Sequence, residues 1–351
     1  MLRQRCQDFT RLHLRQDGKL CRVLQIFGDP INGTAAVMPE LFEVLLQKFF
    51  TRDGNMRTSA LDNTFFLNQI FPIRLGHEPN VLRHLRTVGI NSVEILLNLA
   101  MPSPEIKVVN DADELSRVAA EEFKHAAQAA IEAKGRFTVA LAGGSTPKGL
   151  YSQLAKSKDL PWDKIYFFFG DERHVPPDHL ESNYRMVNEA LFSRASVPPD
   201  HIFRMPTENA DAEAVAQQYE RTLQQFFQLK PGNFPIFDLV LLGLGPDGHT
   251  ASLFPGTTAL RENSRLVVAN WVPKFNAYRL TLTVPVLNQA KQVMFLVSGK
   301  EKRNAAESVL ASDSPPEQFP AKLIRPPHGK VLWLVDRAAL PPALEQRAKL
   351  A

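Results

Sequence analysis

The stretch "FDLVLLGLGPDGHTASLFP", residues 237–255, joins an apolar run to a glycine-rich turn that carries one carboxylate and one imidazole. The run 237–245 is short, branched and bounded by glycine, which predicts a strand buried in a parallel sheet. Asp247 and His249 are two residues apart, so a tight turn could aim both side chains into one site. A neutral imidazole is the usual general base, and a carboxylate can hold its tautomer. A lone histidine more often has a capping or packing role, but the glycines and the strand favour a catalytic role here.

Short apolar runs and helical patterns alternate on both sides of this stretch. Further strands are predicted at 137–143, 165–171, 265–270, 279–284, 293–299 and 330–336. Helices are predicted after the capping-box pair Asp111 and Glu114, and at 147–158, 183–194, 211–228 and 300–311. This alternation predicts an α/β fold with a mainly parallel, open, Rossmann-like sheet and helices on both faces. In such sheets ligands bind beyond the carboxyl ends of the strands, where each motif below is found.

The composition changes near Met101. Residues 1–100 contain ten Arg, two Lys and both cysteines, whereas residues 101–351 contain fourteen Arg, fifteen Lys and no Cys. The first hundred residues have no sustained hydrophobic period and no chemical motif, although 40–50 could form a short helix. We therefore expect the functional domain to be 101–351, with 1–100 a poorly structured extension of unknown role that is either appended to it or spuriously translated and so outside the native protein. The alternative is a small genuine N-terminal domain.

Charge and composition exclude several classes of protein. The net charge of +4 is small for 351 residues, so neither a nucleic-acid partner nor a membrane partner is expected. No run of about eighteen apolar residues is present. The first eighteen residues lack an apolar signal core, and Asp8 and Asp17 argue against a transit peptide. Cys6 and Cys21 do not make a disulfide framework or a metal site, so the cytoplasm is the expected compartment.

The stretch "LAGGSTPKGLY", residues 141–151, has the composition of a phosphate-binding turn. Gly143 and Gly144 end a predicted strand, and a helix is predicted to follow with Thr146 as N-cap and Pro147 in its first position. Glycine lets backbone N–H groups approach a ligand closely, and a helix start adds partial positive charge. The turn is neither a Walker loop nor a Gly-x-Gly-x-x-Gly fingerprint. A plain strand-to-helix turn remains the alternative.

A third strand end, in "FFFGDERHVPPDHLESNY" (167–184), places charged residues directly after an aromatic strand. Asp171 is a candidate catalytic carboxylate, and Arg173 is well shaped to bind a phosphate or an oxyanion. A solvated charged turn is the alternative. His174 and His179 are expected on the surface. Downstream, the cations at element ends that could close an anionic site are Arg279, Lys300 and Lys302.

These motifs, in this order, resemble those of the 6-phosphogluconolactonase family, which shares the wider fold of the glucosamine-6-phosphate isomerases. The resemblance covers about residues 105–336 and includes "GGSTP", "GDERHVP", "SNY", "DLVLLGLGPDGHTASLFP" and "RLTLTVPVLN". It implies hydrolysis of 6-phospho-D-glucono-1,5-lactone to 6-phosphogluconate, in the oxidative pentose phosphate pathway, without a metal or an organic cofactor.

The resemblance also implies roles for individual residues. His249 would activate water and Asp247 would orient it, with Asp171 as a further catalytic candidate. The substrate phosphate would be held by Gly143, Gly144, Ser145, Thr146, Arg173 and Lys302, with Arg279 as a weaker candidate. The expected partner is therefore a small sugar-phosphate lactone, bound by a monomer or a small homo-oligomer.

Two other functions remain as alternatives. The deaminating isomerases resemble "GxGxDGHIAFNEP" at the third motif, with a glutamate before the proline, where this chain has Phe254. An apolar ring cannot transfer a proton, so isomerisation is disfavoured. A non-catalytic sugar-phosphate sensor would need a DNA-reading head, and residues 1–100 have no clear helix-turn-helix and little lysine. A partner contact by this segment stays open.

Overall fold

The computed structural model describes residues 104–345 and 349–350. The chain divides into two units, residues 1–100 and 101–351, and all described residues belong to the second. Our expectations of an N-terminal extension, and of a helix at 40–50, lie outside the described residues. Within the described part of the chain, no helix is both long enough and apolar enough to cross a membrane.

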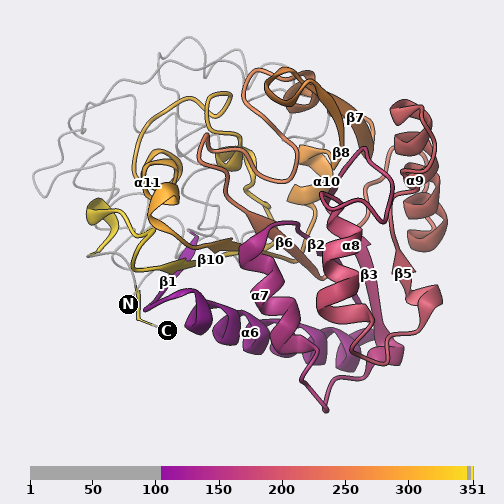
Figure 1. Cartoon of the computed structure of the whole chain (residues 1–351), viewed down its shortest axis with the longest axis horizontal. Helices are drawn as coiled ribbons and strands as arrows, with labels where there is room; N and C mark the ends of the chain where they lie inside the picture. Colours follow the sequence, from indigo (N-terminus) through magenta and orange to yellow (C-terminus); the bar gives the residue numbers. More distant parts are fainter. Residues whose placement is uncertain (1–103, 346–348, 351) are drawn as a thin grey trace, which may run out of the picture. The chain divides into compact units, whose positions relative to one another are not determined.

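The main sheet has eight parallel strands in the order β11-β1-β10-β9-β6-β2-β3-β5. The strands of this sheet that Figure 1 labels follow one another from left to right as β1, β10, β6, β2, β3 and β5. Its strands are β1 Glu105–Val109, β2 Phe137–Leu141, β3 Ile165–Phe169, β5 Ile202–Phe203, β6 Leu239–Gly243, β9 Gln292–Val297, β10 Lys330–Asp336 and β11 Lys349–Leu350. The central strands β2, β3 and β6 are almost entirely buried, which explains their largely apolar sequences. The predicted parallel α/β sheet is confirmed.

Three further strands form a separate antiparallel sheet, in the order β4-β8-β7. They are β4 Asp171–Arg173, β7 Val267–Val272 and β8 Ala277–Leu282. Two of these correspond to the strands predicted at 265–270 and 279–284. Only residues 273–276 separate β7 from β8, which is too short for a crossover helix, so the two strands pair antiparallel.

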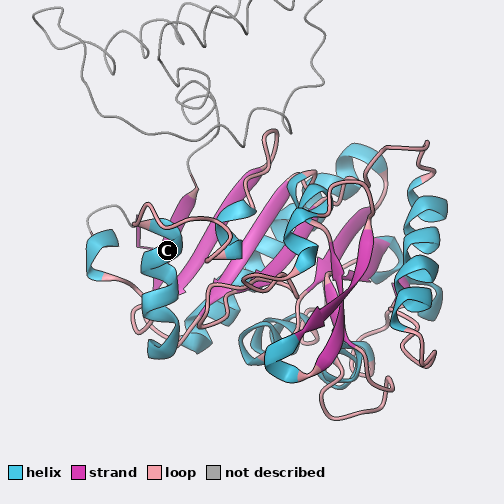
Figure 2. Ribbon diagram, turned by 90° about the horizontal axis from the view of Figure 1, so that it is seen from above, coloured by secondary structure: helices cyan, strands magenta, loops and turns pink. Residues whose placement is uncertain are grey.

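Helices pack on both sides of the main sheet (Figure 2). They are α6 Ala112–Lys134, α7 Ser145–Leu154, α8 Asn183–Val187, α9 Ala212–Phe227, α10 Val284–Asn288 and α11 Arg303–Leu310. One π-helical turn, η3 Asn188–Phe192, continues α8. The 3-10 turns are η2 Trp162–Lys164, η4 Pro199–His201, η5 Thr258–Arg261, η6 Pro273–Phe275, η7 Lys300–Lys302, η8 Pro320–Leu323 and η9 Pro342–Leu344.

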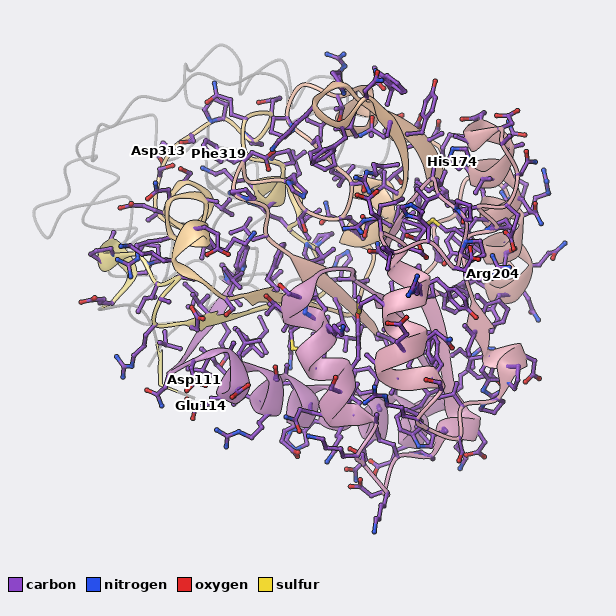
Figure 3. The ribbon with its side chains drawn as sticks, in the orientation of Figure 1. Asp111, Glu114, His174, Arg204, Asp313 and Phe319 are labelled. Atoms are coloured by element: carbon purple, nitrogen blue, oxygen red, sulfur yellow. The ribbon has the colours of Figure 1, made fainter. Side chains whose placement is uncertain are left out.

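The capping pair at the start of α6 is present (Figure 3). The side chain of Asp111 accepts a hydrogen bond from the backbone N–H of Glu114 at 2.8 Å. The Glu114 carboxylate accepts from the backbone N–H of Asn110 at 2.7 Å. Asp111 thus satisfies a backbone donor of the first helical turn, and Glu114 binds the backbone N–H of the residue before the N-cap.

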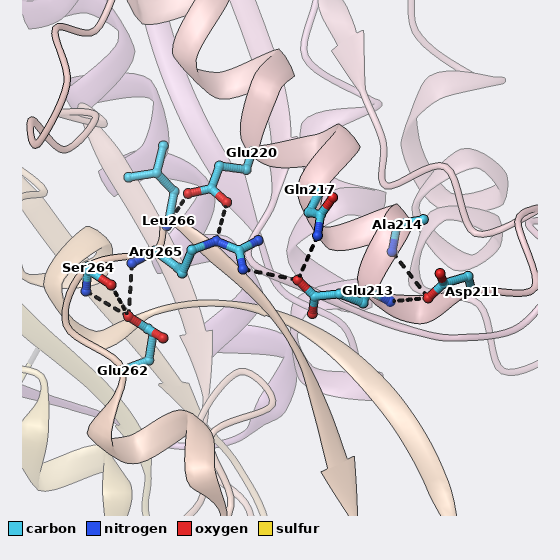
Figure 4. A network of polar contacts seen from close by, with 9 residues as sticks. All are labelled: Asp211, Glu213, Ala214, Gln217, Glu220, Glu262, Ser264, Arg265 and Leu266. Carbon is cyan, nitrogen blue, oxygen red and sulfur yellow. Dashed lines mark hydrogen bonds and ion pairs between the residues drawn. The ribbon is translucent and has the colours of Figure 1, made fainter.

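An ion-pair network attaches α9 to the start of β7 (Figure 4). The Arg265 guanidinium donates to Glu220 at 2.6 Å and to Glu213 at 3.0 Å, and both glutamates lie on α9. The other Glu220 oxygen accepts from the backbone N–H of Leu266 at 2.9 Å. The base of the β7–β8 hairpin is therefore fixed to a helix that packs on the small sheet.

Candidate active site

Four parallel strands bring the sequence motifs to one edge of the main sheet. β9, β6, β2 and β3 are neighbours in that order, so their carboxyl ends lie side by side. Asp247 and His249 follow β6, the glycines 143–144 follow β2, and Asp171 follows β3. Lys302 follows β9, on the far side of β6 from Arg173. This edge is where parallel sheets bind ligands.

Asp247 and His249 form a hydrogen-bonded pair. Nδ1 of His249 contacts Oδ1 of Asp247, and the backbone N–H of His249 reaches the same oxygen at 3.3 Å. Lys274 donates to the other carboxylate oxygen at 3.1 Å. Burial opposes ionisation of Asp247, but the hydrogen bonds from His249 and Lys274 outweigh it and hold the Asp247 pKa well below its usual range. An ionised Asp247 assigns the proton to Nδ1 of His249, which leaves Nε2 as the basic nitrogen.

The neighbours of the His249 ring fix its position. One face stacks on Phe254, with centroids 4.1 Å apart and an interplanar angle of 28°. The ring also lies directly against Gly245, where any side chain would overlap it. The position before Pro255 thus supplies an aromatic face to the imidazole, in place of the carboxylate of the deaminase pattern.

The loop that carries this pair is tightly constrained. The hydroxyl of Thr250 donates to the carbonyl of Gly243 at 2.8 Å, and the backbone N–H of Gly245 donates to the carbonyl of His249 at 2.8 Å. Ala251 has a positive φ of 46°, which is uncommon for a residue with a side chain. Such strain persists only where surrounding structure enforces it, and it often occurs at functional sites.

A chain of contacts joins the three motifs. The hydroxyl of Ser252 donates to Oδ2 of Asp171 at 2.7 Å. The carboxamide of Asn183 donates to the Asp171 carbonyl at 3.0 Å and approaches its Oδ1 at 3.4 Å. That carboxamide also lies against Gly143, where a Cβ would overlap it. Asp171 is only 8% exposed, so its carboxylate is not open to solvent. Its contacts hold the three motifs together.

Glu172 has a structural role on the opposite face of β4. Its carboxylate accepts from the backbone N–H groups of Asn183 and Tyr184, each at 2.7 Å, and so satisfies the first turn of α8. Burial raises the pKa of Glu172 to about 7, although these backbone donors act in the opposite direction.

Arg173 and Arg279 are directly opposite each other on β4 and β8. Opposite residues of an antiparallel pair lie on the same face of the sheet, so two guanidinium groups point the same way. Burial and the nearby charge of Arg173 lower the pKa of Arg279. Nε of Arg279 is buried and has no hydrogen-bond partner among the described residues. Paired arginines with an unused donor are suited to an anion.

The glycine turn after β2 differs in one detail from its prediction. α7 begins at Ser145 with Gly144 as N-cap, so the predicted N-cap at Thr146 is wrong. Gly144 has a φ of 102°, which breaks the extended chain before Thr146 and starts the helix earlier. Ser145 and Thr146 then lie in the first turn of α7. The buried hydroxyl of Tyr151 donates to the Ala142 carbonyl at 2.7 Å and fixes this helix to the end of β2.

The remaining cations and histidines have less connection with this edge. The Lys302 side chain is partly buried, and no contact joins it to the site among the described residues. His174 pairs through Nε2 with the carbonyl of Asn209 at 2.7 Å, and His179 is exposed, as predicted. Within residues 104–345, no group of three or more His, Cys, Asp or Glu is arranged to hold a metal ion.

Three contacts of the site were missed from sequence. Ser252 and Asn183 lie inside the recognised motifs, but only the folded chain brings them to Asp171. Lys274 lies between β7 and β8, where a single exposed lysine carries no sequence signal.

Comparisons with known proteins show the family of this chain. The profile of the family described as glucosamine-6-phosphate isomerases/6-phosphogluconolactonase matches residues 110–333. The chain is 48% identical over 210 residues to a 6-phosphogluconolactonase of Synechocystis sp. This alignment covers 60% of this chain and 86% of that relative. It is 36% identical over 248 residues to a 6-phosphogluconolactonase of Homo sapiens, covering 69% of this chain and 95% of that protein. A solved 6-phosphogluconolactonase from Trypanosoma cruzi superposes with a TM-score of 0.61 at 33% identity, covering 68% of this chain and 97% of that one.

Proposed function

Because this chain belongs to the family of glucosamine-6-phosphate isomerases and 6-phosphogluconolactonases, we propose that it hydrolyses 6-phospho-D-glucono-1,5-lactone to 6-phosphogluconate. It is a 6-phosphogluconolactonase, an enzyme of the oxidative pentose phosphate pathway. The observation that carries the assignment is the pair Asp247–His249, whose imidazole presents Nε2 as a base and stacks on Phe254.

The reaction requires one base and one acid, and a single imidazole can serve as both. Nε2 of His249 takes a proton from water as the water oxygen bonds to the lactone carbonyl carbon. Asp247 stabilises the imidazolium that forms. The tetrahedral intermediate then collapses, the bond to the ring oxygen breaks, and the imidazolium returns the proton to that oxygen. A general base of this kind contributes roughly 10²–10⁴-fold, which covers much of the modest acceleration that a reactive lactone needs.

The phosphate of the substrate binds away from the reacting carbon and fixes its position. Arg173 is its principal ligand, and its register partner Arg279 supplies the second guanidinium. The turn Gly143–Thr146 contributes backbone N–H groups at the start of α7. Lys302, which follows β9, is a further proposed ligand of this anion. The unused Nε of Arg279 supports this assignment.

The two alternative functions have less support. An isomerase or deaminase needs a proton-transferring group where Phe254 stacks on the imidazole, and a phenyl ring has none. A sugar-phosphate sensor would require a nucleic-acid-reading segment in residues 1–100, and their sequence has no pattern of that kind.

Compartment and assembly belong to the same proposal. We expect the enzyme to act in the cytoplasm as a monomer or small homo-oligomer, with a small sugar-phosphate lactone as its partner and neither nucleic acid nor membrane. Two cysteines in 351 residues and a net charge of +4 support this expectation.

One comparison tests the function. The purified chain should release protons from fresh 6-phosphogluconolactone well above the spontaneous rate, and it should leave glucosamine 6-phosphate unchanged. Deamination of glucosamine 6-phosphate, or no acceleration of lactone opening, would contradict the assignment. A shortened chain that starts at Met101 should keep this activity, and its loss would argue for a native role of residues 1–100.

A further inference from the structure

We propose that Lys274, at the tip of the β7–β8 hairpin, is a positioning residue for the catalytic pair. The proposal rests on the proposed function and extends it to a residue outside all of the sequence motifs. Nζ of Lys274 lies 3.1 Å from Oδ2 of Asp247, while Oδ1 of the same carboxylate faces Nδ1 of His249. Each oxygen of Asp247 thus has its own cationic or N–H partner.

The hairpin brings Lys274 to this position by its local geometry. Residues Pro273–Phe275 form a 3-10 turn, and Asn276 closes it with a φ of 48°. Asparagine is among the few residues that tolerate this left-handed conformation. At the base, Thr283 donates to the Arg265 carbonyl at 2.8 Å, and the Glu220 network holds Arg265 (Figure 4). The tip is therefore carried by a hairpin with a fixed base.

The same tip also contacts the ring that supports the imidazole. Phe275 packs edge-on against Phe254, with centroids 5.6 Å apart, and Phe254 stacks on His249. The Lys274 ammonium lies 5.5 Å from the Phe275 ring centroid, and the Arg279 guanidinium lies 5.0 Å from it. Two neighbouring residues of the tip thus act on the catalytic pair, Lys274 through the carboxylate and Phe275 through the aromatic face.

This arrangement restricts the carboxylate. The terminal torsion of an aspartate is broad, so a carboxylate held at one oxygen can swing. With Lys274 on Oδ2, Oδ1 stays directed at Nδ1 of His249 and keeps Nε2 available for water. The charged groups that face His249 in the described contacts are Asp247 and Lys274, with Arg279 behind Phe275.

The expected effects are modest because Lys274 is solvated. Its side chain is 57% exposed, so water screens its charge. We expect Lys274→Met to lower kcat about 3- to 10-fold through misorientation of the base, with KM within about 2-fold of wild type.

Two further variants separate positioning from a structural effect. Lys274→Arg keeps the charge and the donor, and it should restore kcat. Lys230→Met removes an exposed lysine from the loop after α9, outside every contact of the site, and it should change neither kcat nor KM. An unchanged kcat in Lys274→Met, or no rescue by Lys274→Arg, would overturn the proposal.

A measurement without substrate distinguishes this proposal from the proposed function. The ring nitrogen shifts of His249, followed by NMR without substrate at one pH, should report a proton fixed on Nδ1 in the wild type and in Lys274→Arg, and a mixture of the two tautomers in Lys274→Met. An unchanged Nδ1 tautomer in Lys274→Met would refute the role of Lys274 whether or not the chain hydrolyses the lactone. Conversely, a wild-type chain that leaves the lactone intact but shows this tautomer change between the variants would refute only the proposed function.

Discussion

Substitution of Gly245 by alanine should remove most of the activity and leave the fold intact. The His249 ring lies against Cα of Gly245, so an added Cβ would stand 2.8 Å from the ring Cγ and closer still to Nδ1. Restoring an ordinary contact of 3.4 Å requires a retreat of about 0.6 Å at Cγ, and more at Nδ1. The ring is a side chain that can rotate away, so the strain is relieved by loss of the Asp247 contact rather than by unfolding.

The kinetic cost follows from that displacement. A misplacement of about 1 Å in a reacting group costs on the order of 10²-fold, equivalent to about 2.7 kcal/mol of transition-state stabilisation. We therefore expect Gly245→Ala to lower kcat about 10²-fold, with a smaller effect on KM, because the phosphate ligands do not move. Proton release from fresh lactone measures the rate, and thermal unfolding checks the fold.

The last residue of β6 provides a matched control for this variant. Gly243 lies two residues earlier, and an added Cβ there would meet no atom within 4 Å. Gly243→Ala should keep activity within about 3-fold of wild type. If Gly245→Ala retained similar activity, the imidazole would not depend on its position against Gly245, and our geometry of the catalytic pair would be wrong.

Three further predictions concern substrate binding and stability. Arg173→Ala should raise KM by about 10-fold or more with a smaller change in kcat, and an unchanged KM would remove Arg173 from the phosphate site. Asp238 is a buried residue directly before β6, and its carboxylate accepts hydrogen bonds from Thr138 of β2. Burial opposes its ionisation, but its ion pair with Lys134 at 2.8 Å and these hydrogen bonds lower its pKa. Asp238→Asn should therefore lower the unfolding free energy by about 1–3 kcal/mol near pH 7. Urea titrations should show that this difference in unfolding free energy from wild type shrinks as the pH falls below 3.8. Glu220→Gln should weaken the Arg265 network at the hairpin base and lower the unfolding free energy by about 1–2 kcal/mol, and an unchanged urea midpoint would contradict that.

Short apolar runs in the sequence predicted most strands of the main sheet. Runs such as "FTVAL" and "LVLLG" are apolar because both faces of each strand are buried, so sequence alone indicates a central parallel strand. β1 was missed because "EIKVV" mixes charged and apolar residues at the edge of the buried region. β5 has only two residues, too few to give a period.

The antiparallel sheet was harder to predict because its partners are distant in sequence. The strands β7 and β8 were recognised, but β4 has the sequence "DER", which is typical of a charged turn. Pairing with β8 turns that segment into a strand and places Arg173 opposite Arg279. No property of the sequence near Arg173 indicates this neighbour, which lies more than a hundred residues away.

The candidate site was predictable where its chemistry lies in one turn. Asp247 and His249 are two residues apart, so sequence proximity and spatial proximity coincide. By contrast, Lys274 reaches Asp247 across 27 residues through the geometry of the hairpin. The predicted N-cap at Thr146 failed because the conformation of Gly144, rather than a side-chain cap, determines where α7 begins.

The lactonase activity of His249→Ala tests the central claim most directly. The substitution removes the imidazole from a partly exposed turn, so the variant should fold with nearly the wild-type melting temperature. Its rate of proton release from 6-phosphogluconolactone should fall by roughly 10²–10⁴-fold, which is the contribution of one general base. A variant that folds and hydrolyses the lactone at the wild-type rate would exclude His249 as the base.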